Sequence, residues 1–343
     1  MNVLHRAMWL SLAGTLSVLA QTPTISAVDN GFSFKATLSP GVLATVFGSN
    51  LTGNSLEVLV KGQSAPVTFS SATQLNIQIP WDVADGKTSV VVKHDGLTSA
   101  PFSVTISEYS PALVSDNGTG SGLGVFYSGA NLITTTNPAN AGDTLLTYAV
   151  GLGGTNPAIG TGVDTPNPPP YYYTLVEPSI TVGGKAAAVL FSGLAPLALA
   201  TDQLNFTLAT NTPVGTETVV LKIGTATTNL INVPIGCLDS SSGVSVTLGP
   251  LNHPSSGKYT QKATITNVSG TQLQAKGSLI LTGLTTTATL TNGGGTSCPS
   301  SDGSAFKSFT FTGTGSAQTA SVTLDFTDTT SGSITYGTRV LTK

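Results

Sequence analysis

One stretch of the chain, residues 58–96, carries the pattern that most constrains the fold. Between Gln74 and Ile79, polar and apolar residues alternate without interruption. This alternation is typical of a β-strand with one buried side and one solvent-facing side. The turn pairs Asp85-Gly86 and Asp95-Gly96 lie on either side of a β-branched run of three valines, as in a hairpin. The stretch therefore predicts a β-sandwich module built from hairpins.

A degraded copy of this stretch returns in the next part of the chain. Gln74 and Gln203 lie 129 residues apart, and Gly86 and Gly215 are separated by the same number of residues. The second copy carries seven extra residues before its alternating strand. The two glutamines and the two glycines, which lie on either side of one strand in each copy, have the same separation. This indicates that the same hairpin-built sandwich occurs twice in the chain. The segment between the copies, about residues 107–121, is predicted to be a short linker.

From about Gly236 a third group of strand candidates follows. Turn pairs such as Asn292-Gly293 and Asp302-Gly303 separate them. The six candidates are Val244–Leu248, Ala263–Ile265, Leu279–Leu281, Phe309–Phe311, Val322–Phe326 and Ile334–Tyr336. Sustained helical periodicity is absent from the sequence after residue 20. We therefore predict an all-β chain of three sandwich modules, residues 21–107, 108–236 and 237–343.

The first two modules resemble a known family through a series of short motifs. In the first module these are Pro40-Gly41, Phe47–Leu51, Val60–Gly62, Ala65-Pro66, Gln74–Asn76, Ile79–Trp81, and Gly86 with Val90–Val92; in the second they include Asn137–Ala139, Gly142-Asp143, Gly151–Gly153, Gly193–Pro196 and Gln203–Asn205. The series resembles an IPT/TIG-type immunoglobulin-like repeat. More narrowly, it resembles the uncharacterised Solibacter-type domain at the C-termini of large secreted acidobacterial proteins.

This resemblance extends over about residues 25–235. It implies tandem immunoglobulin-like β-sandwiches, and it carries no known activity and no catalytic residues. The third module is similar to the fibronectin-like appendages of bacterial secreted proteins in composition, without a motif match. The fold expected from the whole chain is therefore three β-sandwiches in a row.

The first twenty residues, Met1–Ala20, have the features of a secretory signal peptide. Arg6 lies in a short first segment, an apolar run of about 13 residues follows, and small residues precede a cleavage position before Gln21. A membrane anchor is the alternative, but an anchor needs roughly 20 apolar residues to span a bilayer. Since we find no later segment that is long and apolar enough, we predict a secreted or cell-surface protein without a membrane span in its mature part.

The composition excludes several classes of partner. Only 8% of the residues are charged and the formal net charge is −3, whereas an ordinary soluble domain has about 25% charged residues. A surface with so little positive charge does not attract phosphates, so we expect no nucleic-acid partner. Lysines scattered singly also argue against an anionic membrane surface.

The two cysteines of the chain, Cys237 and Cys298, are predicted to form a disulfide. An oxidising compartment permits such a bridge, and two free thiols are the alternative because the sequence does not fix the distance between them. Two cysteines without a neighbouring histidine do not make a structural zinc site. We therefore predict no metal site and no cofactor.

Catalytic constellations are missing from the sequence as we interpret it. His94 and His253 are interpreted as solvated turn residues, and no G-x-S-x-G motif is present. The four glutamates of the mature chain, Glu57, Glu108, Glu177 and Glu217, show no spacing that suggests a catalytic pair. The loop Asp116–Gly120 resembles part of a calcium loop but lacks its acidic cluster. We therefore predict a protein that is not an enzyme.

The best candidate for ligand recognition is the tyrosine run Tyr171, Tyr172 and Tyr173, together with Trp81. Three prolines precede the run and are expected to hold the tyrosines out as an extended arm. Exposed aromatic rings stack on sugar rings or on peptide backbones. The alternative is that the tyrosines fill an interface between modules.

Two functions follow from these observations. The first is a non-enzymatic secreted or cell-surface protein that acts as an adhesive or spacer module and binds other surface proteins. The second is a carbohydrate-binding accessory protein whose Tyr171–Tyr173 arm binds an extracellular polysaccharide.

Overall fold

The computed structural model describes residues 21–167, 170–295, 297–328, 330 and 333–343. In this part of the chain the structure has 32 strands, β1 to β32, and two short 3-10 turns, η1 (Ser241–Gly243) and η2 (Gly315–Ala317). The prediction of an all-β protein is confirmed. The predicted signal peptide lies outside the described residues, and within them no helix is long and apolar enough to cross a bilayer.

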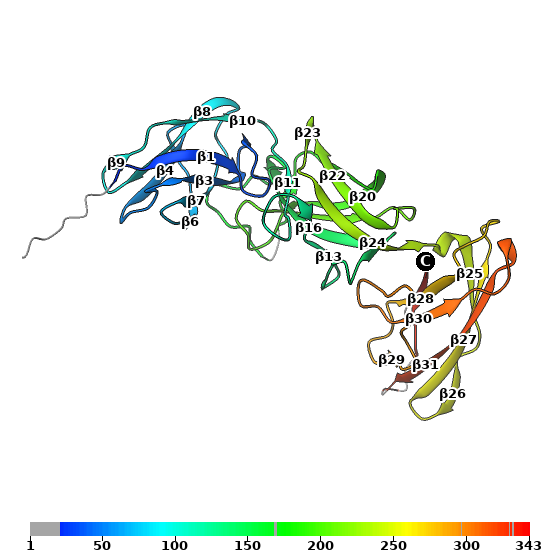
Figure 1. The fold of residues 1–343 in the computed structure, drawn as a ribbon. Helices are drawn as coiled ribbons and strands as arrows, with labels where there is room; N and C mark the ends of the chain where they lie inside the picture. Colours follow the sequence, from blue (N-terminus) through cyan, green and yellow to red (C-terminus); the bar gives the residue numbers. More distant parts are fainter. Residues whose placement is uncertain (1–20, 168–169, 296, 329, 331–332) are drawn as a thin grey trace, which may run out of the picture.

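The first region, residues 21–107, folds into two sheets that enclose one hydrophobic core (Figure 1). One sheet has the strand order β1-β3-β7-β6, and the other has the order β2-β10-β8-β4-β5 with β9 paired to β8. Leu75 and Ile77 of β7 are buried, whereas Gln74 and Asn76 are partly exposed, as the alternation predicts. The strands are β1 (Thr24–Asn30), β2 (Thr37–Leu38), β3 (Leu43–Ser49), β4 (Leu56–Val60), β5 (Gln63–Ser64), β6 (Val67–Ser70), β7 (Gln74–Gln78), β8 (Gly86–His94), β9 (Leu97–Thr98) and β10 (Phe102–Ile106).

The second region, residues 108–236, is built around its own hydrophobic core. The long strand β20 joins its two sheets, because the first part of β20 pairs with β19 and the last part pairs with β21. A β-bulge between Val189 and Phe191 separates the two parts. The strands are β11 (Ala112–Leu113), β12 (Gly122–Leu123), β13 (Phe126–Ser128), β14 (Asn131–Leu132), β15 (Ala139–Asn140), β16 (Thr144–Val150), β17 (Thr155–Asn156), β18 (Tyr173–Thr174), β19 (Ser179–Val182), β20 (Lys185–Leu194), β21 (Asp202–Thr207), β22 (Gly215–Ile223), β23 (Ala226–Thr227) and β24 (Ile231–Asp239).

The two copies of the sequence repeat form matching strands. β8 and β22 are both nine residues long, and each begins at a glycine with a positive φ angle, +110° and +142° respectively. In the preceding strand of the first copy, Gln74 Nε2 donates a hydrogen bond to Asn76 Oδ1 at 2.9 Å. The second copy repeats this bond from Gln203 to Asn205 at 3.0 Å. The equal offsets in the sequence therefore correspond to equal positions in the two folds.

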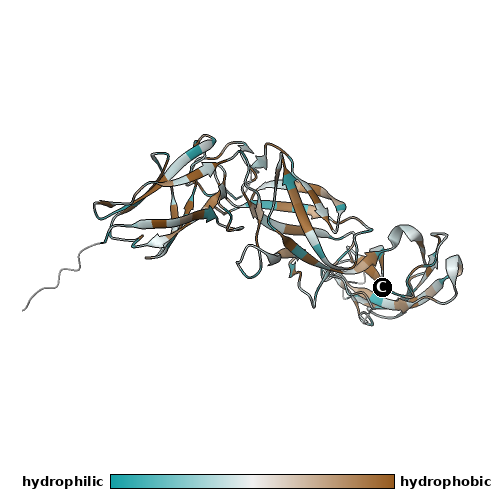
Figure 2. Cartoon of the chain, turned by 45° about the horizontal axis from the view of Figure 1, so that its top comes forward, coloured by the Kyte–Doolittle hydropathy of each residue, from teal (hydrophilic) through white to brown (hydrophobic). Residues whose placement is uncertain are grey.

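The third region, residues 237–343, packs around a further core. One of its sheets has the order β25-β27-β31-β29 with β26 paired to β27, and the other contains β28, β30 and β32. Figure 2 shows hydrophobic residues along the strands of all three regions. The strands are β25 (Val244–Leu248), β26 (Asn252–Ser255), β27 (Lys258–Asn267), β28 (Lys276–Thr282), β29 (Ala288–Leu290), β30 (Phe306–Thr310), β31 (Thr319–Asp328) and β32 (Gly337–Thr342).

One predicted strand in this region is wrong. Residues 334–336 lie outside any strand, and β32 begins directly after them at Gly337. Ile334 is buried in the third core and the ring of Tyr336 packs on Phe326 at 5.6 Å. The apolar residues of this segment therefore fill the core from a loop, which an alternating pattern does not distinguish from a strand.

The second and third regions are joined by a continuous strand and a disulfide. β24 leaves the second core and pairs with β32, where Leu238 lies opposite Thr342. Beside this pairing, Cys237 forms a disulfide with Cys298, and their Cα atoms are 6.1 Å apart. The cysteines are 61 residues apart in sequence, and closing a loop of that length stabilises the fold by roughly 4 kcal/mol in the chain-entropy model.

A partly buried ionic cluster lies at the same junction. The Arg339 guanidinium forms ion pairs with Asp143 and with Asp239, the latter at 2.8 Å from Nε to Oδ2. It also donates to the Ala141 carbonyl, and Ser301 donates to Asp143. Burial lowers the pKa of Arg339, but the two carboxylates outweigh burial and raise that pKa. Arg339 therefore stays charged and connects β32 to the start of β16.

The first and second regions also share direct contacts. The predicted linker contains β11, and Ala112 is part of the first core. Asn30 Nδ2 donates to the Ser110 carbonyl at 2.8 Å. From the second region, Thr161 Oγ1 accepts a hydrogen bond from the Trp81 backbone N–H at 2.9 Å. The three regions therefore follow one another in a row, connected by packed junctions (Figure 1).

Candidate functional site

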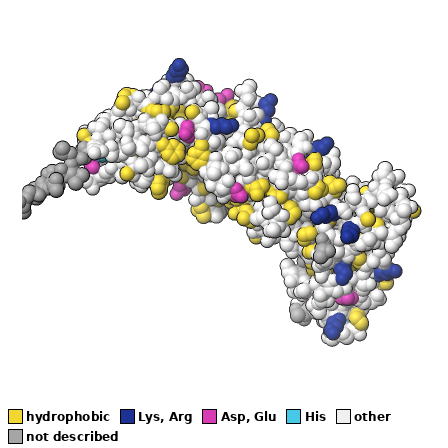
Figure 3. Space-filling view, viewed as in Figure 1, with side chains coloured by type: hydrophobic (Ala, Val, Ile, Leu, Met, Phe, Trp, Pro, Cys, Tyr) yellow, Lys and Arg dark blue, Asp and Glu magenta, His cyan; other side chains and the backbone are white. Residues whose placement is uncertain are grey.

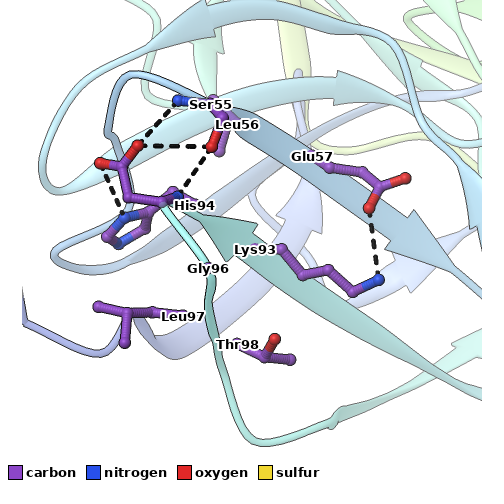
Figure 4. A pocket seen from close by; sticks show the side chains of 9 residues that line it. Ser55, Leu56, Glu57, Lys93, His94, Gly96, Leu97 and Thr98 are labelled. Atoms are coloured by element: carbon purple, nitrogen blue, oxygen red, sulfur yellow. Dashed lines mark hydrogen bonds and ion pairs between the residues drawn. The ribbon is translucent and has the colours of Figure 1, made fainter.

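A hollow of about 400 Å³ between β4 and the β8–β9 turn brings together a serine, a histidine and an aspartate (Figure 4). Ser55 N–H donates to Asp95 Oδ1 at 3.0 Å, and Asp95 Oδ2 lies 3.7 Å from His94 Nδ1. His94 Nε2 lies 2.7 Å from the Asn50 carbonyl oxygen. Because a carbonyl only accepts, Nε2 carries a proton and is not free to remove one from a serine. Asp95 lies between the other two residues, whereas a hydrolase triad requires the histidine in the middle.

The environment of His94 corrects one sequence prediction. His94 is only 4% exposed, so it is not a solvated turn residue. It is the last residue of β8, and its ring is fixed by the Asn50 carbonyl. Backbone hydrogen bonds from Ser55 and Asn54 hold the pKa of the neighbouring Asp95 below its usual value. These contacts fix the turn.

The other candidates for chemistry are not brought together. His253 is exposed and its ring stacks on Tyr259 at 4.5 Å. In the loop Asp116–Gly120, Asn117 Oδ1 accepts hydrogen bonds from Thr119 N and Oγ1, which is a local turn. Within the described part of the chain, no group of three or more His, Cys, Asp or Glu residues could hold a metal ion.

The three predicted tyrosines lie at the edge of the second region. Tyr173 begins β18, which pairs with β17 and with Gly193 of β20, so the last residue of the run is part of a sheet, whereas Tyr171 and Tyr172 precede the strand. The Tyr172 carbonyl accepts a hydrogen bond from Leu194 N–H at 2.8 Å. Tyr171 and Tyr173 are 49% and 50% exposed. Pro168 and Pro169, two of the prolines expected to stiffen an arm, lie outside the described residues.

The exposed tyrosine rings form a cluster with Phe191 of β20. The ring centroids of Tyr173 and Phe191 are 5.4 Å apart, and those of Tyr171 and Phe191 are 6.1 Å apart. Beside this cluster is a hollow of about 290 Å³ whose walls include Leu190 and Glu177. Leu190 lies at the β-bulge of β20 and is 63% exposed, because a bulged residue does not follow the alternation of the strand.

Trp81 does not line the hollow beside the tyrosines. Its ring lies against Gly41, where a side chain on Gly41 would collide with it. Trp81 lines a separate hollow at the junction of the first two regions together with Ile159 and Leu175. Its Nε1–H is buried and has no hydrogen-bond acceptor among the described residues. Trp81 therefore packs at a junction.

The strand register places further residues on the face that carries the tyrosine cluster. In one row across the sheet, Tyr148 of β16 lies opposite Gln203 of β21, Gln203 lies opposite Gly193, and Gly193 lies opposite Tyr173. Residues directly opposite in an antiparallel pair share one face. The next row contains Leu146, Asn205 and Phe191, with Tyr127 of β13 opposite Leu146.

We call this surface the aromatic–amide face. It comprises Tyr127, Leu146, Tyr148, Gln203, Asn205, Phe191, Tyr171 and Tyr173. The opposite side of the same strands carries the core residues Leu145, Leu204 and Phe206, which are fully buried. The inner residues hold the sheet in place, and the outer residues are therefore free to meet a ligand.

A second hollow, of about 430 Å³, lies at the other end of the aromatic–amide face. Tyr127, Tyr148 and Gln203 line it together with Phe32 from the first region and Pro196 from the loop after β20. Among the residues that line this hollow and the one beside Tyr173, Glu177 is the sole charged side chain. Figure 3 shows hydrophobic side chains gathered along the middle of the molecule and charged ones lying singly.

The sequence indicated the end of this face that contains Tyr173 and did not indicate the end that contains Tyr148. Tyr171 and Tyr173 were visible as a run, and the alternation around Gln203 and Asn205 indicated an exposed side. Tyr148 belongs with Gly151–Gly153 to the motif series of the family resemblance, which does not indicate a binding role, and Phe191 carries no local signal because it is one aromatic residue in an ordinary strand. Only their register relative to β21 identifies them.

Comparison with known proteins identifies a family for part of the chain. Residues 23–108 match the IPT/TIG domain family. The IPT/TIG domain corresponds to the first region, whose motifs resembled that family, so this part of the resemblance is confirmed. No curated protein matches the chain significantly.

Several solved structures match the chain with low TM-scores and low sequence identity. The plexin A4 extracellular region, domains 1 to 8, is 12% identical with a TM-score of 0.26, over 67% of this chain and 20% of plexin. The titin tandem A164–A165 is 11% identical with a TM-score of 0.16, over 58% of this chain and 91% of that chain. The gamma-CGTase from alkalophilic Bacillus clarkii is 13% identical with a TM-score of 0.24, over 63% of this chain and 26% of the enzyme.

This chain therefore spans about a fifth of the length of plexin A4. The likeness concerns the fold alone, and the low TM-scores carry no argument about function. The paired sheets and the IPT/TIG match agree with the immunoglobulin-like β-sandwich class that was predicted, and that class is confirmed.

Proposed function

We propose that this protein is a non-enzymatic secreted or cell-surface interaction protein, built from immunoglobulin-like modules at residues 21–107, 108–236 and 237–343. The aromatic–amide face is its contact surface, and packed junctions hold that surface at a fixed place along the chain. We also propose that residues 25–235 are related to the Solibacter-type domain that they resemble.

One observation carries the proposal. The aromatic–amide face exposes Tyr171 and Tyr173 by about half, on a sheet whose other side is a closed core. Exposed aromatic clusters of this kind are typical of binding surfaces. The arrangement of Ser55, His94 and Asp95 supports the non-enzymatic part, since the acid separates the serine from the histidine.

A second function, a carbohydrate-binding accessory protein, is favoured by the same tyrosines. Tyr173, Tyr171 and Phe191 expose aromatic surface next to an amide row, and aromatic rings stack on the apolar faces of sugars. A protein partner remains the alternative ligand of this surface.

Export and adhesion test the proposal together. The full chain, expressed with a C-terminal epitope in a bacterial host, is expected in the medium or on the cell surface, where protease removes the epitope from intact cells. Beads coated with the purified protein are expected to adhere to surfaces that carry its ligand. The double variant Tyr171→Ala, Tyr173→Ala is expected to reduce that adhesion, because it removes the exposed rings.

The matched control is Phe69→Ala on the first region, where a ring of similar exposure, 49%, lies outside the proposed surface. Retention of the epitope inside intact cells would contradict export. Equal adhesion by the double variant and the unchanged protein would exclude the aromatic–amide face as the contact surface.

A further inference from the structure

The aromatic–amide face has aromatic rings at both ends and amides in the middle. Tyr127 and Tyr148 lie at one end, on β13 and β16, and Phe191 and Tyr173 lie at the other, on β20 and β18. Three strand-to-strand steps separate Tyr148 from Tyr173 in one row. At about 4.8 Å per step, the backbones of the two tyrosines are about 14 Å apart, which exceeds the length of a single sugar ring.

The amides between the rings have unused hydrogen-bonding groups. Gln203 Nε2 donates to Asn205 Oδ1 at 3.0 Å, and this bond fixes the orientation of both side chains. Among the described residues, Gln203 Oε1 and Asn205 Nδ2 have no hydrogen-bond partner, and both side chains are partly exposed. The middle of the face therefore offers one acceptor and one donor, the combination that a hydroxyl group can satisfy on both sides.

The charge of the face selects among ligands. Glu177 is the sole charged residue lining either of its two hollows. Neither lining contains a lysine or arginine that could pair with a phosphate, sulfate or carboxylate. A neutral ligand is therefore favoured over an anionic one. A protein partner of ordinary composition is less suited, because Glu177 is the one residue lining the two hollows that could pair with a charged side chain of the partner.

We infer that the aromatic–amide face binds a neutral, linear oligosaccharide that lies across the strands from β13 to β18. One sugar ring stacks at Phe191 and Tyr173, another packs at Tyr148 and Tyr127, and the sugar hydroxyls between them bond to Gln203 and Asn205. This inference rests on the proposed function and specifies the ligand of its contact surface.

Calorimetry with defined oligosaccharides tests the inference on the purified protein. The probes are the hexasaccharides of β-1,4-glucose, β-1,3-glucose, β-1,4-xylose and β-1,4-N-acetylglucosamine, and hexagalacturonate as an anionic counterpart. At least one neutral hexasaccharide is expected to bind, and its disaccharide is expected to bind more than about tenfold more weakly, because it reaches only one aromatic end. Hexagalacturonate is expected to show no binding.

Variants at both ends test the two-ended geometry. Tyr173→Ala, Tyr148→Ala and Gln203→Ala are each expected to weaken the bound hexasaccharide roughly three- to tenfold, as the loss of one stacked ring or one hydrogen bond does. Phe69→Ala and Gln74→Ala, the matched changes on the first region, are expected to leave the affinity unchanged. Unchanged melting curves of the variants show that the sheet is intact, and Tyr127→Ala replaces Tyr148→Ala if the latter does not fold.

Several results would overturn the inference. These are no binding of any neutral hexasaccharide, equal binding of the anionic one, full retention of affinity in Tyr148→Ala and Tyr127→Ala, or occupation of the face by a protein ligand. If export and bead adhesion persist in those cases, the proposed function stands and only the sugar assignment is lost. If the protein neither leaves the cell nor adheres, the proposed function fails as well.

Discussion

The first two regions carry the same glutamine–asparagine pair on equivalent strands, yet their outer faces differ. In the first region Phe47 lies opposite Gln74 and Phe69 lies opposite Asn76. In the second region Tyr148 and Phe191 occupy the corresponding places. Aromatic residues therefore lie opposite the amide pair in both regions, and the outer faces differ in what lies beyond these residues.

The difference arises at the edge of the sheet. β6 ends its sheet in the first region, so no strand lies beyond Phe69. In the second region β18 pairs with β20 and adds Tyr173 beside Phe191, and the segment before β18 adds Tyr171. Extra residues also form the loop after β20, whose Pro196 closes the second hollow. One added strand and one longer loop thus convert a plain sheet face into a candidate binding surface.

The two regions also differ in the side chains that pack on a glycine turn. Gly41 and Gly142 both precede the strand that pairs with the Gln–Asn strand, and their φ angles are +76° and +82°. Gly41 packs against the ring of Trp81, whereas Gly142 packs against Arg339 and Asp239. The same turn is therefore closed by an aromatic ring in one case and by a partly buried ionic cluster in the other.

The largest effect is expected at the ionic junction. Arg339→Ala leaves Asp143, which is 4% exposed, without its cation, and should lower the free energy of unfolding by about 3–5 kcal/mol. Trp81→Phe, which keeps a ring over Gly41, should cost less than about 1.5 kcal/mol. Denaturant titration measures both. Equal losses in the two variants would mean that the ionic cluster adds no more than ordinary packing.

The matching strands of the repeat predict equal effects in both regions. Leu75→Ala and Leu204→Ala each remove a fully buried side chain from equivalent strands and should each cost about 2–5 kcal/mol. The free energies of unfolding from denaturant titration check this. A loss confined to one variant would show that the two cores are not equivalent.

A buried carboxyl distinguishes the second region and predicts a pH effect. Burial raises the pKa of Asp202 to about 8, although a hydrogen bond from Leu152 N–H lowers it. The folded state therefore holds a proton that the unfolded state releases above its ordinary pKa of 3.8, so the stability that this group contributes decreases as the pH rises from about 4 to about 8. Asp202→Asn should be more stable than the unchanged protein at pH 8, on the order of 1–3 kcal/mol, and the gain should shrink at pH 5.

Thermal melts at both pH values measure this effect. The matched residue of the first region, Thr73, is exposed, so Thr73→Asn serves as the control and should leave the pH dependence unchanged. A pH dependence that Asp202→Asn does not reduce would show that this carboxyl does not control it.

The smallest effect is expected from the exposed rings themselves. Phe191→Ala should cost about 0.5–1.5 kcal/mol more than Phe69→Ala, because Phe191 contacts two tyrosine rings. Chemical denaturation of the two variants gives the difference. If Phe69→Ala lowers the free energy of unfolding more than Phe191→Ala does, the contacts of Phe191 with the two tyrosine rings do not stabilise the second region as expected.

The sequence alone determined the inner side of each strand. A fault-free alternation such as Gln74 to Ile79 leaves a single way to bury Leu75 and Ile77, because the side-chain period of a strand is two. Turn glycines and the repeat offset then located the matching strands of the second region. The run 334–336 shows the limit of this reasoning, since apolar residues also fill a core from a loop.

The tertiary structure alone decided which outer residues meet. His94 is buried because Asn50 and Gly53, 44 and 41 positions earlier in the chain, lie against it. Trp81 lies at a junction because Gly41 leaves room for its ring. Tyr148, Gln203 and Tyr173 form one row only through the register of β16, β21, β20 and β18. Periodicity acts between neighbours in the chain, whereas a surface depends on pairings between distant strands, and local sequence does not encode those pairings.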